Sequence, residues 1–284
     1  MSKPLFRDES HSEERAFYGF RGVTLVNCRF EGAEDGESAL KECADITAED
    51  CIFSLRYPLW HCKGSLLYRC QMNDTCRAPL WYSEHTDIRA CRISGVKALR
   101  ECIASNITDS RVISNEFGWK CKGFTASDTY FEGEYLFLNS TDISLEKIEL
   151  KGKYSFQYIE NATVKDSVLD TKDAFWHAKN VTVSNCRLKG EYLGWYSENL
   201  RLVNCEIIGT QPLCYARGLI LENCVMINTD LAFEKSEVTA DIAGEVESVK
   251  NPKSGIITAD SFGEIILDLP SSAIIRKRTE CNNK

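Results

Sequence analysis

The sequence Val181-Thr-Val-Ser-Asn-Cys-Arg-Leu-Lys-Gly190 recurs along the chain at a step of nineteen residues. Leu200-Arg-Leu-Val-Asn-Cys-Glu-Ile-Ile-Gly209 follows it, and a third near copy occupies Leu219 to Asn228. Upstream the repeat needs four and two extra residues, which fit in turns. A fixed period of this length indicates a solenoid. The residue at the centre of each repeat is small or apolar throughout: Cys28, Cys51, Cys70, Cys91, Ser110, Thr129, Ile148, Ser167, Cys186, Cys205 and Cys224.

Within one repeat, apolar and polar residues alternate with the period of a β-strand. Columns of Asn, Asp and Gly mark three corners, so we expect three short strands in each repeat. Strands this short need partners in the neighbouring repeats, which favours parallel stacking. Parallel crossovers are overwhelmingly right-handed. We therefore predict an all-β, single-stranded right-handed parallel β-helix of about eleven rungs. Its central core column is Phe30, Phe53, Met72, Ile93, Val112, Phe131, Leu150, Leu169, Leu188, Ile207 and Met226.

We expect one domain, because the repeat is continuous. Residues 1–19 are predicted to form an N-terminal cap and a partial rung, and residues 20–235 the regular rungs. Residues 236–270 are predicted to form degenerate rungs and a C-terminal cap, followed by a tail at residues 271–284.

Composition limits the possible functions. The formal net charge of −8, without a Lys/Arg block, argues against nucleic acid as a partner. No apolar run approaches the roughly 20 residues of a membrane span. The charged start lacks the apolar stretch of a secretory signal, so we expect a cytoplasmic protein. The 14 cysteines form no Cys-x-x-Cys pair. They exchange with Ser and Ala in the repeat columns, so we interpret them as small buried residues and expect neither a metal nor a cofactor.

All five tryptophans fall in one column of the repeat, together with Lys41 and Arg100. The sequence leaves two orientations open. Strict alternation would point this column into the core, whereas a bend would place the preceding Leu40-type residues in the core and turn the tryptophans toward solvent. The Lys and Arg members favour the second orientation, because lone cations are rarely buried. The next column contains no aliphatic residue: Glu42, His61, Tyr82, Glu101, Lys120, Asn139, Tyr158, His177, Tyr196, Tyr215 and Glu234.

An exposed aromatic column flanked by cations is typical of an interaction surface. Its predicted ligand is a saccharide or a small acidic molecule. Acid/base groups on successive rungs make His61, Tyr82, Glu101 and Lys120 candidate catalytic residues. The predicted ligand-binding residues are Lys41, Trp60, Trp81, Arg100, Trp119, Trp176 and Trp195.

Several stretches resemble a bacterial family of single-domain β-helix proteins without an assigned function: Glu37-Ser-Ala-Leu-Lys-Glu42, Arg56-Tyr-Pro-Leu-Trp60, Lys172-Asp-Ala-Phe-Trp176, Gly190-Glu-Tyr-Leu-Gly-Trp195, Asp230-Leu-Ala-Phe-Glu234 and Ala259-Asp-Ser-Phe-Gly-Glu-Ile-Ile266. The resemblance implies a pectate-lyase-like right-handed β-helix, but it transfers no catalytic residue. Fold alone is not evidence of activity. Three hypotheses follow: a saccharide-binding protein, a lyase or hydrolase acting on oligo- or polysaccharides, and a structural or protein-binding rod. The oligomeric state stays open.

Overall fold

Short parallel strands joined by tight turns make up residues 3–32 and 37–278, which the computed structural model describes. The chain divides into an N-terminal unit, Met1–Leu150, and a C-terminal unit, Lys151–Lys284. No helix occurs among the described residues, so none could span a membrane. The predicted all-β, right-handed parallel β-helix is confirmed.

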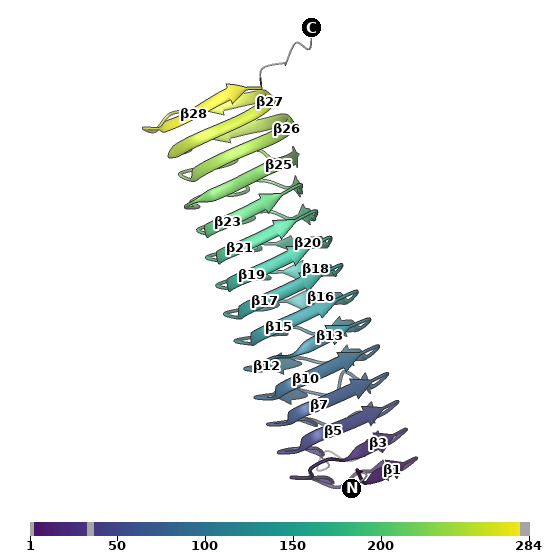
Figure 1. Cartoon of the computed structure of the whole chain (residues 1–284). Helices are drawn as coiled ribbons and strands as arrows, with labels where there is room; N and C mark the ends of the chain where they lie inside the picture. The colour runs from purple at the N-terminus through teal and green to yellow at the C-terminus, as the bar shows by residue number, and fades with distance from the viewer. Residues whose placement is uncertain (1–2, 33–36, 279–284) are drawn as a thin grey trace. The chain divides into compact units, whose positions relative to one another are not determined.

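In the N-terminal unit, two sides of each turn carry strands (Figure 1). Among the described residues of this unit, the third side carries strands only at β9 (Leu80–Trp81) and β12 (Leu99–Arg100). The first side consists of β1 (Leu5–Arg7), β3 (Thr24–Val26), β5 (Ala44–Glu49), β7 (Lys63–Tyr68), β10 (Glu84–Arg89), β13 (Asn106–Thr108), β15 (Lys122–Ser127) and β17 (Thr141–Glu146). The second side consists of β2 (Ser10–His11), β4 (Arg29–Phe30), β6 (Ile52–Phe53), β8 (Gln71–Met72), β11 (Arg92–Ser94), β14 (Arg111–Ile113) and β16 (Tyr130–Glu134).

Strand register in this unit follows the sequence repeat. Ile88 lies opposite Ile107, one period of nineteen residues further along the chain. The extra residues enter between strands: Phe30 lies opposite Phe53, and Leu67 lies opposite Ile88. The insertions are therefore absorbed by the turns, and the strands stay in register.

The C-terminal unit follows the same plan up to residue 208 and then changes to longer strands (Figure 1). Val181 lies opposite Leu200 in the regular part. Beyond it the step shortens, with Val238 opposite Gly255. β18 (Glu149–Lys153) spans the junction of the two residue ranges. The other strands are β19 (Glu160–Lys165), β20 (Val168–Lys172), β21 (Lys179–Ser184), β22 (Arg187–Lys189), β23 (Glu198–Val203), β24 (Glu206–Ile208), β25 (Leu219–Ile227), β26 (Glu237–Lys250), β27 (Ser254–Ile266) and β28 (Ser272–Lys277).

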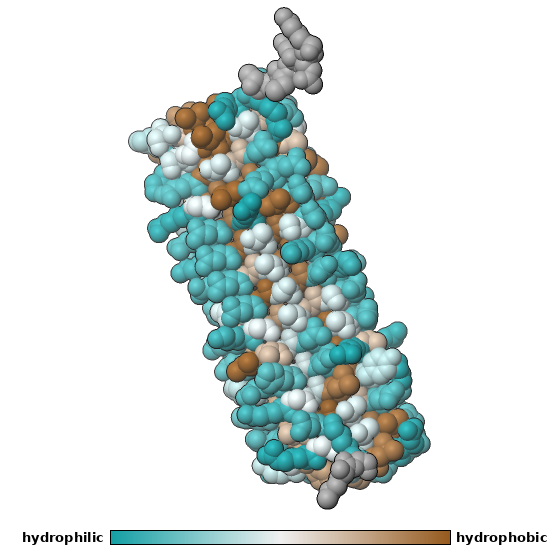
Figure 2. Space-filling model, in the orientation of Figure 1, coloured by the Kyte–Doolittle hydropathy of each residue, from teal (hydrophilic) through white to brown (hydrophobic). Residues whose placement is uncertain are grey.

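Alternation along the strands separates core from surface within each unit. Every residue of the predicted central core column is buried, from Phe30 to Leu150 in the first unit and from Leu169 to Met226 in the second. The residues on either side of a core-column residue are less buried, and some are charged, as Arg187 and Lys189 are beside Leu188. On the face in Figure 2, hydrophilic side chains accordingly cover much of the surface.

Two details of the prediction need correction. The described residues make about 14 turns, against the eleven predicted, because β1 and β2 add a turn before residue 20 and β26 to β28 add turns after residue 235. The third strand of each rung is mostly absent, because left-handed residues such as Tyr57 and His61 interrupt the extended backbone there. The single domain with caps and a tail stays a prediction; residues 1–2 of that cap and 279–284 of that tail lie outside the described residues.

Candidate functional site

The tryptophan column of the N-terminal unit faces outward. Leu59 and Cys62 are fully buried, while Trp60 between them is half-buried and His61 is exposed. The cause is the backbone of His61, whose φ of 57° lies in the left-handed region and bends the chain. Two neighbouring residues therefore point outward between two core residues. Of the two orientations left open by the sequence, the bent one is correct.

Hydrogen bonds between turns hold this column in register. The backbone N–H of His61 donates to the carbonyl oxygen of Trp81, at 2.9 Å. The N–H of Tyr82 donates to the carbonyl of Arg100 at 3.0 Å, and the N–H of Glu101 to that of Trp119 at 2.8 Å. The side chains of successive turns are consequently stacked above one another at a fixed spacing.

Two indole rings of the unit are anchored to the next turn. Trp81 Nε1 donates to the carbonyl oxygen of Lys97 at 3.0 Å, and Trp119 Nε1 donates to that of Tyr135 at 2.5 Å. Trp60 lacks such an anchor: its Nε1 is buried and has no hydrogen-bond partner among the described residues. Its ring meets Trp81 edge to face instead, with centroids 6.2 Å apart.

Two cations lie against these rings. Lys41 Nζ is 4.6 Å from the ring centroid of Trp60. The Arg100 guanidinium lies between two indoles, 5.1 Å from the centroid of Trp81 and 5.2 Å from that of Trp119. These distances are typical of cation–π contacts. The structure thus brings together the five predicted binding residues of the N-terminal unit, which we call the Trp–Arg face: Lys41, Trp60, Trp81, Arg100 and Trp119.

The four candidate catalytic residues project from successive turns beside this face. The rings of His61 and Tyr82 are 5.0 Å apart. Glu101 Oε1 lies 3.6 Å from Arg100 Nε, so that carboxylate is engaged with the cation. Lys120 is exposed and has no carboxylate within 4.0 Å in the part of the chain that the structure describes. The arrangement can supply charge and hydrogen bonds to a bound ligand, and a catalytic role stays a prediction.

Trp176 and Trp195 belong to the C-terminal unit, where they adjoin a stack of rings. The stack, which we call the tyrosine ladder, consists of Tyr158, His177, Tyr196 and Tyr215. Successive ring centroids lie 5.0, 4.9 and 4.8 Å apart. Burial lowers the pKa of His177, an effect that Lys179 reinforces and Glu198 opposes.

These four residues were not predicted from the sequence to form a site, although they share the column of His61 and Tyr82. Their aromatic identity at a spacing of nineteen residues was the signal that could have revealed them.

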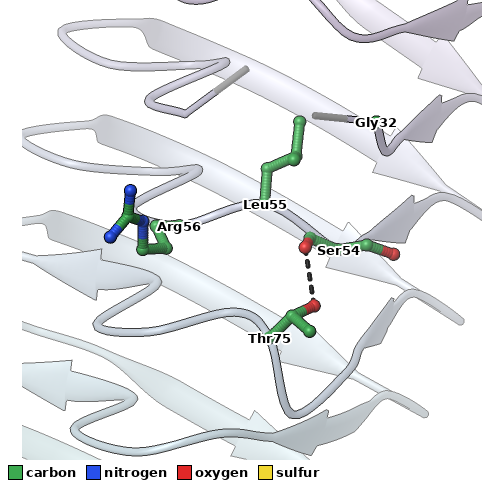
Figure 3. Close-up of a pocket in the computed structure, with 5 residues that line it drawn as sticks. All are labelled: Gly32, Ser54, Leu55, Arg56 and Thr75. Carbon is green, nitrogen blue, oxygen red and sulfur yellow. Dashed lines mark hydrogen bonds between the residues drawn. The ribbon is translucent and has the colours of Figure 1, made fainter. Parts of the chain in front are cut away.

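A pocket of about 290 Å³ lies elsewhere in the N-terminal unit. It is lined by Gly32, Ser54, Leu55, Arg56 and Thr75, as Figure 3 shows. Thr75 Oγ1 donates to the carbonyl oxygen of Ser54 at 2.6 Å, and Arg56 Nε lies 3.0 Å from Glu37 Oε2. Because none of these lining residues is aromatic, this pocket is a weaker candidate for the predicted saccharide than the Trp–Arg face.

Comparison with known families gives one match, covering residues 5–279, to a family described as "Protein of unknown function (DUF3737)". The chain belongs to the DUF3737 family. No curated protein sequence matches this DUF3737 protein significantly. The resemblance to a β-helix family without assigned function is therefore confirmed, and its pectate-lyase-like grouping is not tested by this match.

The solved structures that resemble this DUF3737 protein include a glucanase, an adhesin and an epimerase. The catalytic domain of a GH87 α-1,3-glucanase in complex with nigerose shares 11% identity, with 85% of this chain and 61% of that chain covered and a TM-score of 0.42. PfbA, a surface adhesin of Streptococcus pneumoniae, shares 9%, with 100% and 80% covered and a TM-score of 0.37. The A-module of the Azotobacter vinelandii mannuronan C-5 epimerase AlgE6 shares 9%, with 97% and 89% covered and a TM-score of 0.35. At these values no activity is transferred.

Proposed function

We propose that the Trp–Arg face binds an acidic saccharide. The observation that carries the proposal is the position of the Arg100 guanidinium between Trp81 and Trp119, 5.1 and 5.2 Å from their centroids. A planar guanidinium held between two indoles keeps its N–H groups in a fixed orientation. Such a group suits a carboxylate, which it can engage with two parallel hydrogen bonds.

The aromatic residues supply the second part of the recognition. Trp81 is half-buried, and its N–H is already bound to the Lys97 carbonyl, so its ring is held in place before a ligand arrives. A preorganised ring lowers the entropy cost of binding. Lys41, beside Trp60, has no carboxylate within 4.0 Å among the described residues and adds a second positive charge. Together these groups favour a ring-shaped, negatively charged ligand over a neutral one.

We also propose that the protein belongs to the pectate-lyase-like β-helix superfamily, and that it is bacterial and cytoplasmic. The parallel pairing of strands within each unit supports the grouping. The thirteen free, buried cysteines among the described residues support a reducing compartment.

Calorimetric titration of the whole protein with hexagalacturonate tests the proposal. We expect binding, and we expect Arg100→Ala and Trp81→Ala to weaken it about tenfold or more, because each removes a cation–π partner and Arg100 also removes a charge-assisted bond. Arg111→Ala is the matched control, since Arg111 also lies over an aromatic ring, 3.9 Å from the centroid of Tyr130, but on another strand. Equal losses for Arg100→Ala and Arg111→Ala would contradict a specific site.

Incubation with the same hexasaccharide distinguishes a binding protein from an enzyme. If the protein is a lyase or hydrolase, incubation with hexagalacturonate releases shorter products, which chromatography detects. We expect the hexasaccharide to remain intact. No binding of hexagalacturonate, or of the related hexamannuronate, would overturn the proposal.

A further inference from the structure

The aromatic constellation of the Trp–Arg face has a second copy in the C-terminal unit. Trp60-His-Cys-Lys63 and Trp81-Tyr-Ser-Glu84 occupy adjacent turns of the first unit, and Trp176-His-Ala-Lys179 and Trp195-Tyr-Ser-Glu198 occupy adjacent turns of the second. The two tryptophans of each copy meet edge to face, with centroids 6.2 Å apart in the first copy and 6.1 Å in the second. The His and Tyr rings lie 5.0 and 4.9 Å apart.

Further contacts recur in both copies. Lys and Glu of successive turns pair in each, with Lys63 Nζ 3.2 Å from Glu84 and Lys179 Nζ 4.0 Å from Glu198. The second tryptophan of the second copy, Trp195, is anchored through Nε1 to the Gln211 carbonyl at 2.7 Å. The indole N–H of the first tryptophan, Trp176, is buried without a hydrogen-bond partner among the described residues. The same residue types therefore make the same Trp–Trp and Lys–Glu contacts twice, while the His and Tyr rings are tilted by 52° in the first copy and nearly parallel, at 9°, in the second.

The residues around the two copies differ in charge. In the repeat, the positions of Lys41 and Arg100 are taken by Gln157 and Cys214 in the second copy. The positions of Glu42 and Glu101 are taken by Tyr158 and Tyr215, which extend the His–Tyr pair into the tyrosine ladder. The second copy thus has no cation at these two column positions and has phenolic hydroxyls in place of the carboxylates, while Lys235 Nζ lies 5.7 Å from the ring centroid of Tyr215.

The ladder exposes ring edges. Its planes are nearly parallel, at 7° to 12° to one another, so the ring faces cover each other. Tyr158 is 52% exposed and Tyr196 is 40% exposed. Neither hydroxyl has a hydrogen-bond partner in the described part of the chain, whereas the hydroxyl of Tyr215 donates to Glu234 at 3.3 Å. The ladder thus presents the hydroxyls of Tyr158 and Tyr196, two turns apart with His177 between them, whereas Tyr215 lies beside Glu234 and Lys235.

Trp195 lies across this row. Its ring makes angles of 80° with Tyr196 and 74° with Tyr215, and it is half-buried. A fixed indole beside the Tyr158 and Tyr196 hydroxyls combines an apolar platform with neutral hydrogen bonding. This is the combination that a hydroxyl-rich, uncharged sugar chain requires.

We propose that the tyrosine ladder and Trp195 form a second binding site, specific for a neutral linear oligosaccharide. The hydroxyls of Tyr158 and Tyr196, which lie two turns apart, bond to hydroxyls of non-adjacent sugar residues, and the Trp195 ring packs against a sugar face. This inference is independent of the acidic-saccharide site, because it uses other residues and a ligand without charge.

Titration of the whole protein with cellohexaose, maltohexaose and laminarihexaose tests this proposal. We expect at least one of them to bind, and Tyr196→Phe to weaken that binding about tenfold, because the ring stack remains and only the hydroxyl is lost. Trp195→Ala should weaken it further.

Arg100→Ala provides the control, since it should leave binding of the neutral hexasaccharide unchanged while it weakens binding of hexagalacturonate. The proposal is overturned if none of the three neutral probes binds, or if Tyr196→Phe and Tyr158→Phe both retain full affinity. Because the probes differ in charge, a failure at the ladder is distinguishable from a failure at the Trp–Arg face.

Discussion

Single residues in the left-handed conformation determine which side chains reach the surface. His61, Tyr82 and Glu101 have φ values of 57°, 56° and 52°. This conformation costs a residue with a Cβ roughly 1–2 kcal/mol, and Gly or Asn adopts it more readily. Asn can adopt the same conformation, as Asn139 does with a φ of 54°. The large polar and aromatic side chains at the other positions therefore serve contacts beyond the bend, which fits a binding surface.

The clearest contrast between neighbouring residues is at Leu188 and Arg187. Leu188 is 1% exposed, so Leu188→Ala should lower the free energy of unfolding by roughly 2–5 kcal/mol through lost burial and a cavity. Arg187 is exposed, and its contact with Glu206 is a surface ion pair of 3.3 Å. Arg187→Ala should therefore cost under about 0.5 kcal/mol. Urea unfolding of both variants measures the difference, and similar midpoints would contradict the observed orientation.

The loss of unfolding free energy for Trp81→Ala should lie between those for Arg187→Ala and Leu188→Ala. Its ring is half-buried and its N–H is bonded to the Lys97 carbonyl, so Trp81→Ala should cost about 2 kcal/mol. A loss of about 4 kcal/mol or more would indicate a core role and would weaken the case for a binding surface. Thermal unfolding of the variant, beside Arg111→Ala as a surface control, provides the measurement.

Trp81 also shows a limit of prediction from the sequence. Period-2 alternation correctly predicted the core positions on the strands, such as Leu188. It could not orient Trp81, because the bend that reverses the alternation lies at Tyr82 and His61, and neither residue type is a turn former.

At the scale of the element, stacking between turns converts a column of the sequence into a contact surface. Tyr158, His177 and Tyr196 belong to consecutive turns and make nearly parallel ring contacts. The sequence repeat could place these residues in one column, but it could not predict ring planes, which depend on side-chain rotamers. It also could not predict that most third strands are replaced by turns, since left-handed residues such as Tyr57 carry no turn signature.

His177 makes the stability of this ladder depend on pH. The pKa of His177 is lowered, chiefly by burial between its neighbours, while Glu198 opposes the shift and Lys179 adds to it. The unfolded chain therefore binds a proton at higher pH than the folded chain does. The stabilising contribution is complete above the unfolded pKa of about 6.5 and is lost as the pH falls below it toward the folded pKa.

Thermal unfolding between pH 5 and 7.5 checks this expectation. The melting temperature of the protein should fall on acidification in this range, and that of His177→Gln should fall less steeply, because the variant has no imidazole to protonate. His85→Gln provides a matched control, since His85 is an exposed histidine of the N-terminal unit. The expectation is wrong if His177→Gln and the unchanged protein show the same slope.

At the scale of the whole molecule, buried cysteines run through the repeats of both units. Their thiols donate to backbone carbonyls of the preceding turn, as Cys62 does to Leu40 at 3.0 Å and Cys102 to Leu80 at 2.8 Å. The nineteen-residue period sufficed to predict this burial, because the columns exchange with Ser and Ala. Small size and a weak donor are what the position requires, and the same carbonyl contact is made by Ser83 to Leu59 at 2.8 Å.

Thiol reactivity should report this arrangement across the molecule. Burial raises the pKa of Cys43 and of Cys186 to about 11 and that of Cys76 and of Cys214 to about 12. Hydrogen bonds from neighbouring cysteines lower the pKa of Cys51, Cys91, Cys102 and Cys205 instead, but these thiols are also buried. Reaction with an aromatic disulfide reagent requires an accessible thiolate, so the buried thiols should hardly react at pH 8 in the folded protein. All thirteen cysteines in the described ranges are free and buried, and Cys281 lies outside those ranges. We expect few of the 14 cysteines to react before denaturation and nearly all to react after it. Several disulfides, or many thiols reacting in the folded state, would contradict the buried columns.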